Sequence, residues 1–154
     1  MYPYLLVFHS FTRWIVLFLM ISSLVLCIHG LITKRNFTKP DHLFRILTIA
    51  FSHFQLVLGF FLYFKSPIVR SFFSDPAGSL VIADSRFFTL IHISLMFISV
   101  ILLTVGSAVS KRKKEEPDKF KNLLVWNSIA LILILIAIPW PFSPLATRPY
   151  LRGF

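Results

Sequence analysis

The sequence contains a single cysteine, Cys27, and only six acidic residues in 154. One thiol excludes an internal disulfide and any metal site built from several cysteines. None of the acidic residues lies within the four long apolar stretches of the chain. A phosphate-binding loop and a Ser-His-Asp order are also missing from the sequence. These absences disfavour hydrolases that use paired carboxylates and pumps that move protons along buried carboxylates.

Apolar residues are what the chain has in excess, because 56% of it is hydrophobic and only 14% is charged. Soluble domains usually stay at roughly 45–50% apolar residues. Four apolar stretches, at about 5–32, 43–64, 87–109 and 120–138, reach or approach the ~20 residues that cross a bilayer as a helix. The first stretch is about twice as long as the apolar part of a signal peptide, and we expect it to be retained. The sequence therefore predicts an integral membrane protein.

Spans of this kind can satisfy their backbone groups in lipid only as helices. We predict an all-α fold, an up-down-up-down four-helix bundle that forms a single transmembrane domain over residues 1–154. Pro40 and Asp41 predict the start of the second helix, with Asp41 as its N-cap. An outer loop over 65–86 and an outer C-terminal tail over 139–154, rich in proline and aromatic residues, are expected at one membrane surface.

The formal net charge of +10 is unevenly distributed. Most basic residues cluster in the first and third connections, which lie on the same side of a four-span protein. By the positive-inside rule that side is cytoplasmic. We expect a multi-pass protein of the bacterial inner membrane with both termini extracytoplasmic. The charge then serves topology and contact with anionic lipid, and a nucleic-acid partner is disfavoured. The clustered basic residues are Lys34, Arg35, Lys39 and Arg45, followed by Lys111, Arg112, Lys113, Lys114, Lys119 and Lys121.

Histidines inside the spans are the candidate ligands. His9 lies in the first span, His53 near the middle of the second, and His92 in the third. The first and third helices of an up-down bundle can be diagonal partners, so His9 and His92 can clamp a flat macrocycle with one imidazole from each side. Centring each span on the bilayer gives a depth difference of order 9 Å for this pair and a similar one for His53 and His92. Depth alone does not choose between the pairs.

Arginines on the outer side are the candidate anion contacts. Arg13 follows His9 by four residues and shares its helix face, and Arg86 precedes the third span. Arginine binds carboxylates well, including haem propionates. The alternative for both residues is contact with lipid phosphates at the membrane surface. For His53, the alternative is a hydrogen bond to a neighbouring helix.

The chain also resembles a family of small four-span bacterial membrane proteins, seen in Bacteroidetes and often labelled cytochrome b. The resemblance covers nearly the whole chain. It rests on the stretches "HSFTRW", "FQLVLGFFLYFKSP", "SRFFTLIH" and "IPWPF". Such relatives often place an acidic residue directly before the histidine of the third helix, whereas this chain has Ile91 there. The resemblance implies haem binding.

We therefore expect a membrane-embedded protein that binds haem b in the outer half of the bundle and transfers electrons. His9 and His92 are the expected axial ligands of the iron, His53 is a third ligand or hydrogen-bond partner, and Arg13 and Arg86 contact the propionates. A quinone or a larger respiratory complex is the expected electron partner. The alternative is a cofactor-free accessory subunit of a larger membrane complex. A stand-alone catalyst acting on haem or quinone is less favoured.

Overall fold

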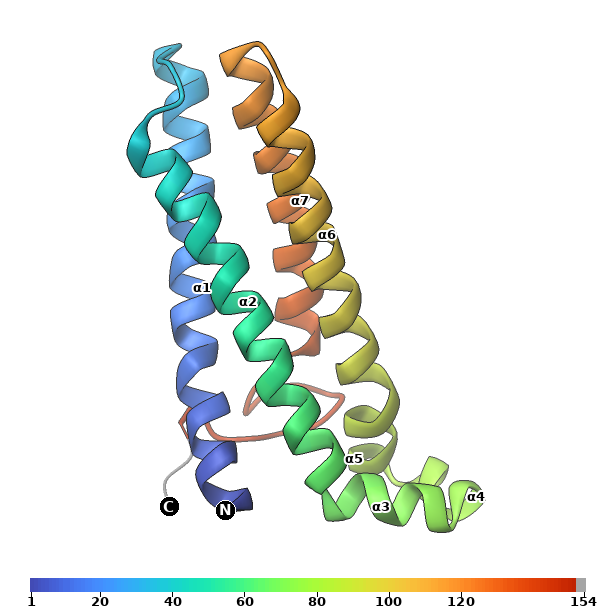
Figure 1. Ribbon diagram of the computed structural model, residues 1–154. Helices are drawn as coiled ribbons and strands as arrows, with labels where there is room; N and C mark the ends of the chain where they lie inside the picture. The colour runs from blue at the N-terminus through green and yellow to red at the C-terminus, as the bar shows by residue number, and fades with distance from the viewer. Residues whose placement is uncertain (152–154) are drawn as a thin grey trace.

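The computed structural model describes residues 1–151, so the last three residues of the predicted tail lie outside the described residues. Within this range, four helices are long and apolar enough to cross a membrane. They are α1 (Tyr2–Thr33), α2 (Lys39–Lys65), a continuous helix over Ala83–Arg112, and α7 (Glu116–Ala137). They run alternately up and down (Figure 1). The predicted all-α fold with four spans is confirmed, and the chain is a multi-pass membrane protein.

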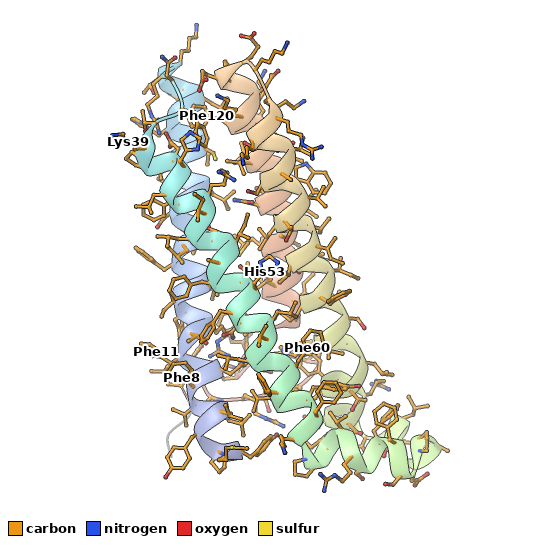
Figure 2. The ribbon with its side chains drawn as sticks, in the orientation of Figure 1. Phe8, Phe11, Lys39, His53, Phe60 and Phe120 are labelled. Carbon is orange, nitrogen blue, oxygen red and sulfur yellow. The ribbon has the colours of Figure 1, made fainter. Side chains whose placement is uncertain are left out.

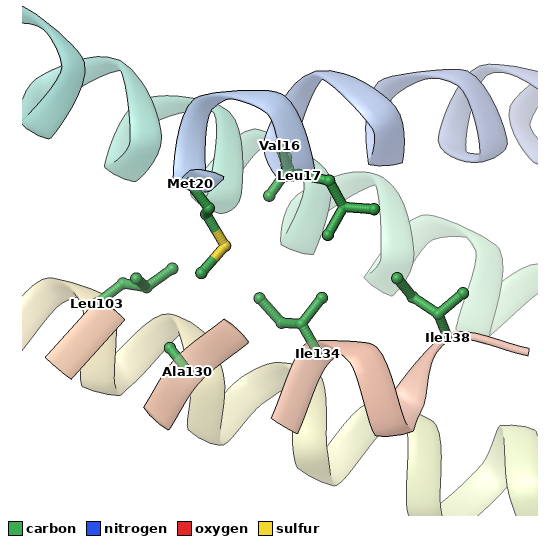
Figure 3. Packing of buried hydrophobic residues seen from close by; sticks show 7 residues of the cluster. All are labelled: Val16, Leu17, Met20, Leu103, Ala130, Ile134 and Ile138. Carbon is green, nitrogen blue, oxygen red and sulfur yellow. The ribbon is translucent and has the colours of Figure 1, made fainter. Parts of the chain in front are cut away.

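The third span has three parts, α5 (Ala83–Arg86), the π-helical turn η1 (Phe87–Ile91) and α6 (His92–Arg112). In the bundle, α1 packs against α2 and α7, and α6 packs against the same two helices. The first and third spans are therefore diagonal, as the up-down topology predicts. The main buried cluster joins α1 and α7, with one residue from α6, and comprises Val16, Leu17, Met20, Leu103, Ala130, Ile134 and Ile138 (Figure 3).

Helix α2 begins at Lys39, four residues before the expected start, and its N-cap is Thr38. The prediction that Asp41 is the N-cap is wrong. Asp41 lies in the first turn, where its carboxylate reaches back and accepts hydrogen bonds from the backbone N–H and the hydroxyl of Thr38, each at 2.7 Å. A carboxylate at this position neutralises the exposed donors of the helix start, so the helix can begin earlier than its apolar run.

The segment predicted as an outer loop over 65–86 is helical. It contains α3 (Pro67–Ser74), α4 (Pro76–Val81) and the first turn of the third span, and Figure 1 shows α3 and α4 projecting sideways from the end of the bundle. Each short helix starts with a proline after a capping residue. The Ser66 hydroxyl accepts from the backbone N–H of Val69, and Asp75 accepts from that of Gly78. Prolines that suggest a loop are here residues of a helical first turn, where proline is well tolerated.

The outer surface of the bundle is apolar, as lipid contact requires. On α1, Phe8 is 51% exposed and Phe11 is 57% exposed, and both lie at the outer side of this helix (Figure 2). Residues 139–151 fold back across the end of the bundle that carries the N-terminus and α3 (Figure 1). The connections at 34–38 and 113–115 lie at the opposite end, which we call the basic end.

Candidate functional site

The imidazoles of His9 and His92 meet between the diagonal helices α1 and α6. Their ring centroids are 6.4 Å apart and the ring planes are inclined by 66°. The expected depth difference of about 9 Å is therefore wrong. The helix ends do not explain this difference, because the observed ranges Tyr2–Thr33 and Ala83–Arg112 have nearly the same centres as the expected spans.

His92 is oriented by the end of α7. Its Nδ1 atom lies 2.7 Å from the carbonyl oxygen of Ala137. A carbonyl can only accept a hydrogen bond, so Nδ1 carries the proton and Nε2 keeps its lone pair. Histidines that bind metals commonly donate their other ring N–H to a backbone carbonyl or carboxylate in this way. The arrangement leaves His92 with one nitrogen free to act as a ligand.

The carbonyl of Ala137 is available because of the prolines in "IPWPF". A continuing helix would bond this carbonyl to the backbone N–H of residue 141, but Pro141 has none. The same applies two residues earlier, where Pro139 cannot donate to the carbonyl of Leu135. That carbonyl accepts instead from the Trp140 indole at 2.8 Å. The two prolines thus end α7 and free two carbonyls, one for an indole and one for the His92 imidazole.

His9 is held from the side of α2. Its backbone carbonyl accepts a hydrogen bond from the Gln55 amide at 2.9 Å, and the Gln55 carbonyl accepts one from the hydroxyl of Thr12. Gly59 lies beside the ring, where an added Cβ would be 3.5 Å from the Cε1 atom of His9. The Nδ1 atom of His9 is buried and has no hydrogen-bond partner within residues 1–151. The backbone at His9 is therefore fixed while its imidazole retains unused polar capacity.

A cavity of about 200 Å³ opens at this level of the bundle. Both imidazoles line it, together with the polar side chains of Arg13, Ser52 and Gln55. The hydroxyl of Ser52 and the Nε atom of Arg13 are also buried without a partner in the described chain. Most other walls are apolar and include Leu6, Leu56, Phe60, Met96, Val100 and Ile134. The cavity is thus lined mostly by apolar side chains and by a few polar ones, which is typical of small-molecule and cofactor sites.

Arg13 is turned toward this cavity by the C-terminal tail. Its guanidinium donates a hydrogen bond to the backbone carbonyl of Tyr150. The Trp14 indole donates to the same carbonyl at 3.1 Å. The guanidinium also lies 5.3 Å from the centre of the Trp14 ring and 5.9 Å from that of Trp140. Aromatic rings and a backbone carbonyl therefore hold the charge of Arg13 at the edge of the site.

Arg148 is a second cation of the cavity, and the sequence analysis did not single it out. It forms an ion pair with Asp84 at 2.7 Å and lies 4.7 Å from the centre of the Phe88 ring. The tail brings it there by turning back on itself, since the Arg148 backbone N–H donates to the carbonyl of Pro139 at 3.1 Å. The prolines and aromatic residues after α7 predict a C-terminal tail at the membrane surface. They do not predict that this tail turns back and brings Arg148 to the cavity.

Two predicted site residues do not reach the cavity. His53 is exposed between α2 and α6 (Figure 2), with Nδ1 2.9 Å from the carbonyl of Ile49 and Nε2 3.4 Å from the hydroxyl of Thr104. Arg86 is exposed, and its guanidinium lies 3.5 Å from the carbonyl of Leu80. The contacts of His53 therefore agree better with a hydrogen bond to a neighbouring helix than with a role as third ligand. Of the predicted set, His9, His92 and Arg13 come together.

Comparison with known proteins leaves the function to be argued from this site. No protein-family model, no characterised protein and no solved structure matches the chain. The resemblance carried by "HSFTRW" and "IPWPF" therefore stays a prediction. What the chain itself offers is an imidazole pair across the bundle, two guanidinium groups, and an apolar cavity between them.

Proposed function

We propose that this chain binds haem b between His9 and His92 and transfers electrons in the membrane. The imidazole pair carries the proposal. Two imidazoles that coordinate one metal ion from opposite sides, each at about 2 Å, have ring centres roughly 6 Å apart. The observed separation is 6.4 Å. The hydrogen bond from His92 to Ala137 supports the same assignment, because it leaves Nε2 as the ligand atom.

The apolar side chains that line the cavity suit an apolar macrocycle, but the cavity is too small for one as it stands. The volume of about 200 Å³ is below the roughly 300–1,000 Å³ of typical ligand pockets. Side chains at the lipid side of the cavity therefore have to move outward on binding. Met96 is flexible about several bonds, and the ring of Phe60 meets that of Phe97 edge-on, with centroids 6.4 Å apart.

The protein's own contribution is ligation, charge and exclusion of water. Haem supplies one-electron redox chemistry at its iron, and the protein sets its potential through ligands, charge and burial. His9 and His92 are the proposed axial ligands. Arg13 and Arg148 offer positive charge for two carboxylates at the end of the cavity that faces the tail. Arg148 would exchange its partner Asp84 for such a carboxylate.

The position of the site indicates where the electrons would go. The cavity lies at the end opposite the basic connections, which is the outer end if the positive-inside rule holds. We infer a protein of the bacterial cytoplasmic membrane with both termini outside, and a haem close to the outer surface. A quinone dissolved in the bilayer or a larger respiratory complex would then be the electron partner.

The test is the absorbance spectrum of protein purified in mild detergent and reduced with dithionite. The wild type should show sharp α and Soret bands. His9→Ala and His92→Ala should each abolish the low-spin spectrum. His53→Ala is the matched control, because it removes a histidine that lies outside the cavity, and it should keep full haem occupancy. A wild-type protein that stays colourless after haem is supplied would refute the proposal and favour the cofactor-free accessory subunit.

A further inference from the structure

The basic end of the bundle carries more positive charge than its acidic residues can balance. Asp41 is engaged by Arg35, whose guanidinium nitrogens lie 2.6 and 2.8 Å from the two carboxylate oxygens. That hydrogen bond raises the pKa of the Arg35 guanidinium above its ordinary value. Glu116 is engaged by Lys119 at 2.5 Å. Among the ion pairs of the described residues, no other joins an acidic to a basic residue at this end.

Arg45 lies inside the second span, on α2. It is six residues into α2, or about 9 Å from the helix start. Its guanidinium donates to the hydroxyl of Ser107 on α6 at 2.6 Å, and none of the ion pairs within residues 1–151 includes it. Its remaining N–H groups are not among the buried atoms that lack a partner. They therefore face accessible space at the surface of the bundle.

The surface around Arg45 is formed by α2 and α6. The two helices are close near α3 and diverge toward the basic end, as Figure 1 shows. Near the basic end, Arg45 of α2 reaches α6, because its guanidinium donates to the hydroxyl of Ser107. Thr104, Ala108 and Lys111 share the face of α6 that carries Ser107, and all three are exposed. The surface beside Arg45 thus has small side chains near the guanidinium and a second cation one turn farther out.

We propose that the α2/α6 surface at the basic end binds the headgroup of an anionic phospholipid. Charge complementarity identifies the occupant. A guanidinium within a span needs an anionic partner, and residues 1–151 provide none in an ion pair with Arg45. The phosphodiester of a lipid can reach this depth from the membrane surface, and a guanidinium binds phosphate through paired N–H groups. Arg45 is the principal contact and Lys111 adds charge at the mouth. Basic surfaces between spans on the cytoplasmic side bind anionic lipids by the same chemistry.

The experiment measures lipid preference of the full chain in a neutral detergent. Phosphatidylglycerol and phosphatidylcholine are titrated separately, and binding is followed by native mass spectrometry and by the melting temperature. The wild type should prefer phosphatidylglycerol. Arg45→Gln should reduce its affinity for that lipid about tenfold or more, because a charge-assisted contact is lost. Inorganic phosphate at the same concentration should have no comparable effect.

Three further variants separate this site from general charge and from helix packing. Arg112→Gln removes the same charge from an exposed position and should change the affinity less than about twofold. Ser107→Ala removes the bond between the helices but keeps the guanidinium, so the lipid preference should persist. Arg45→Lys should retain a weakened preference, which keeps the proposal testable if Arg45→Gln misfolds. Equal binding of both lipids, equal losses in Arg45→Gln and Arg112→Gln, or an equal effect of inorganic phosphate would overturn it.

Discussion

The backbone carbonyl of Ala137 makes the proposed role of His92 testable without touching a ligand. Pro141→Ala supplies a backbone N–H at the position from which a longer α7 would bond that carbonyl. The new donor competes with Nδ1 of His92, which now occupies the carbonyl at 2.7 Å. When α7 extends, the imidazole loses the partner that holds its orientation and its tautomer. The haem affinity should therefore fall although both proposed axial ligands are present.

The size of the effect follows from this single bond. Loss of a partner that orients a metal-binding histidine lowers metal affinity about 10–100-fold. A neutral hydrogen bond contributes a net ~0.5–1.5 kcal/mol, and about 1.4 kcal/mol corresponds to a factor of ten in affinity. The competition is incomplete, because Pro139 is still present, holds Ile138 in an extended conformation and opposes the extension of α7. We expect the haem affinity to fall about tenfold, near the lower limit of the 10–100-fold range.

The assay is a titration of haem into apoprotein, followed at the Soret band. Pro139→Ala is the matched control, since it supplies an N–H to the carbonyl of Leu135, where the Trp140 indole is displaced and His92 is not. The control should bind haem with an affinity within about twofold of the wild type. The reasoning is refuted if Pro141→Ala binds haem as tightly as the wild type, or if both proline variants lose affinity equally.

Two further predictions concern the charges and the orientation of the bundle. Arg13→Gln and Arg148→Gln should each lower haem occupancy, because each removes a charge-assisted contact of ~1.5–3 kcal/mol, whereas Arg86→Gln should leave it unchanged; equal occupancy in all three would assign the arginines to lipid contact. In a cysteine-free background, Ala77→Cys should react with an impermeant thiol reagent in cells with a permeabilised outer membrane, and Glu116→Cys should not. The opposite labelling pattern would place the cavity at the cytoplasmic face.

Length and hydropathy were sufficient to predict the four spans but not their ends. Apolar stretches identify the segments that cross the membrane, whereas the residues at which helices begin and end depend on individual capping hydrogen bonds. Asp41 lengthens α2 toward its start by accepting from Thr38, and Pro67 and Pro76 open short helices in a segment that composition alone assigns to a loop. Prolines favour both loops and first turns, so their number does not separate the two. The capping residue before each proline carries the distinction.

The sequence was sufficient to predict part of the candidate site, but not which histidine lies opposite His9. Spacing along α1 places His9 and Arg13 on one face, and the up-down topology makes α1 and α6 diagonal. Spans that are apolar on all sides carry little periodicity, so the sequence does not show which face points inward. His53 and His92 are equivalent candidates on that basis. Only the packing of α2 against α6 separates them, with His53 on the exposed side of this contact.

The environment of Arg13 bears on the choice between an anion contact and a lipid anchor. An arginine that reaches for lipid phosphates extends away from the bundle and leaves its guanidinium in the headgroup region. Arg13 instead lies against Trp14 and Trp140 and donates to the tail carbonyl of Tyr150. Its buried Nε atom has no partner in the described chain, and the residue lines the cavity. The tail thus directs the charge of Arg13 inward, onto the same side of α1 as the imidazole of His9, and an anionic group bound in the cavity would satisfy it.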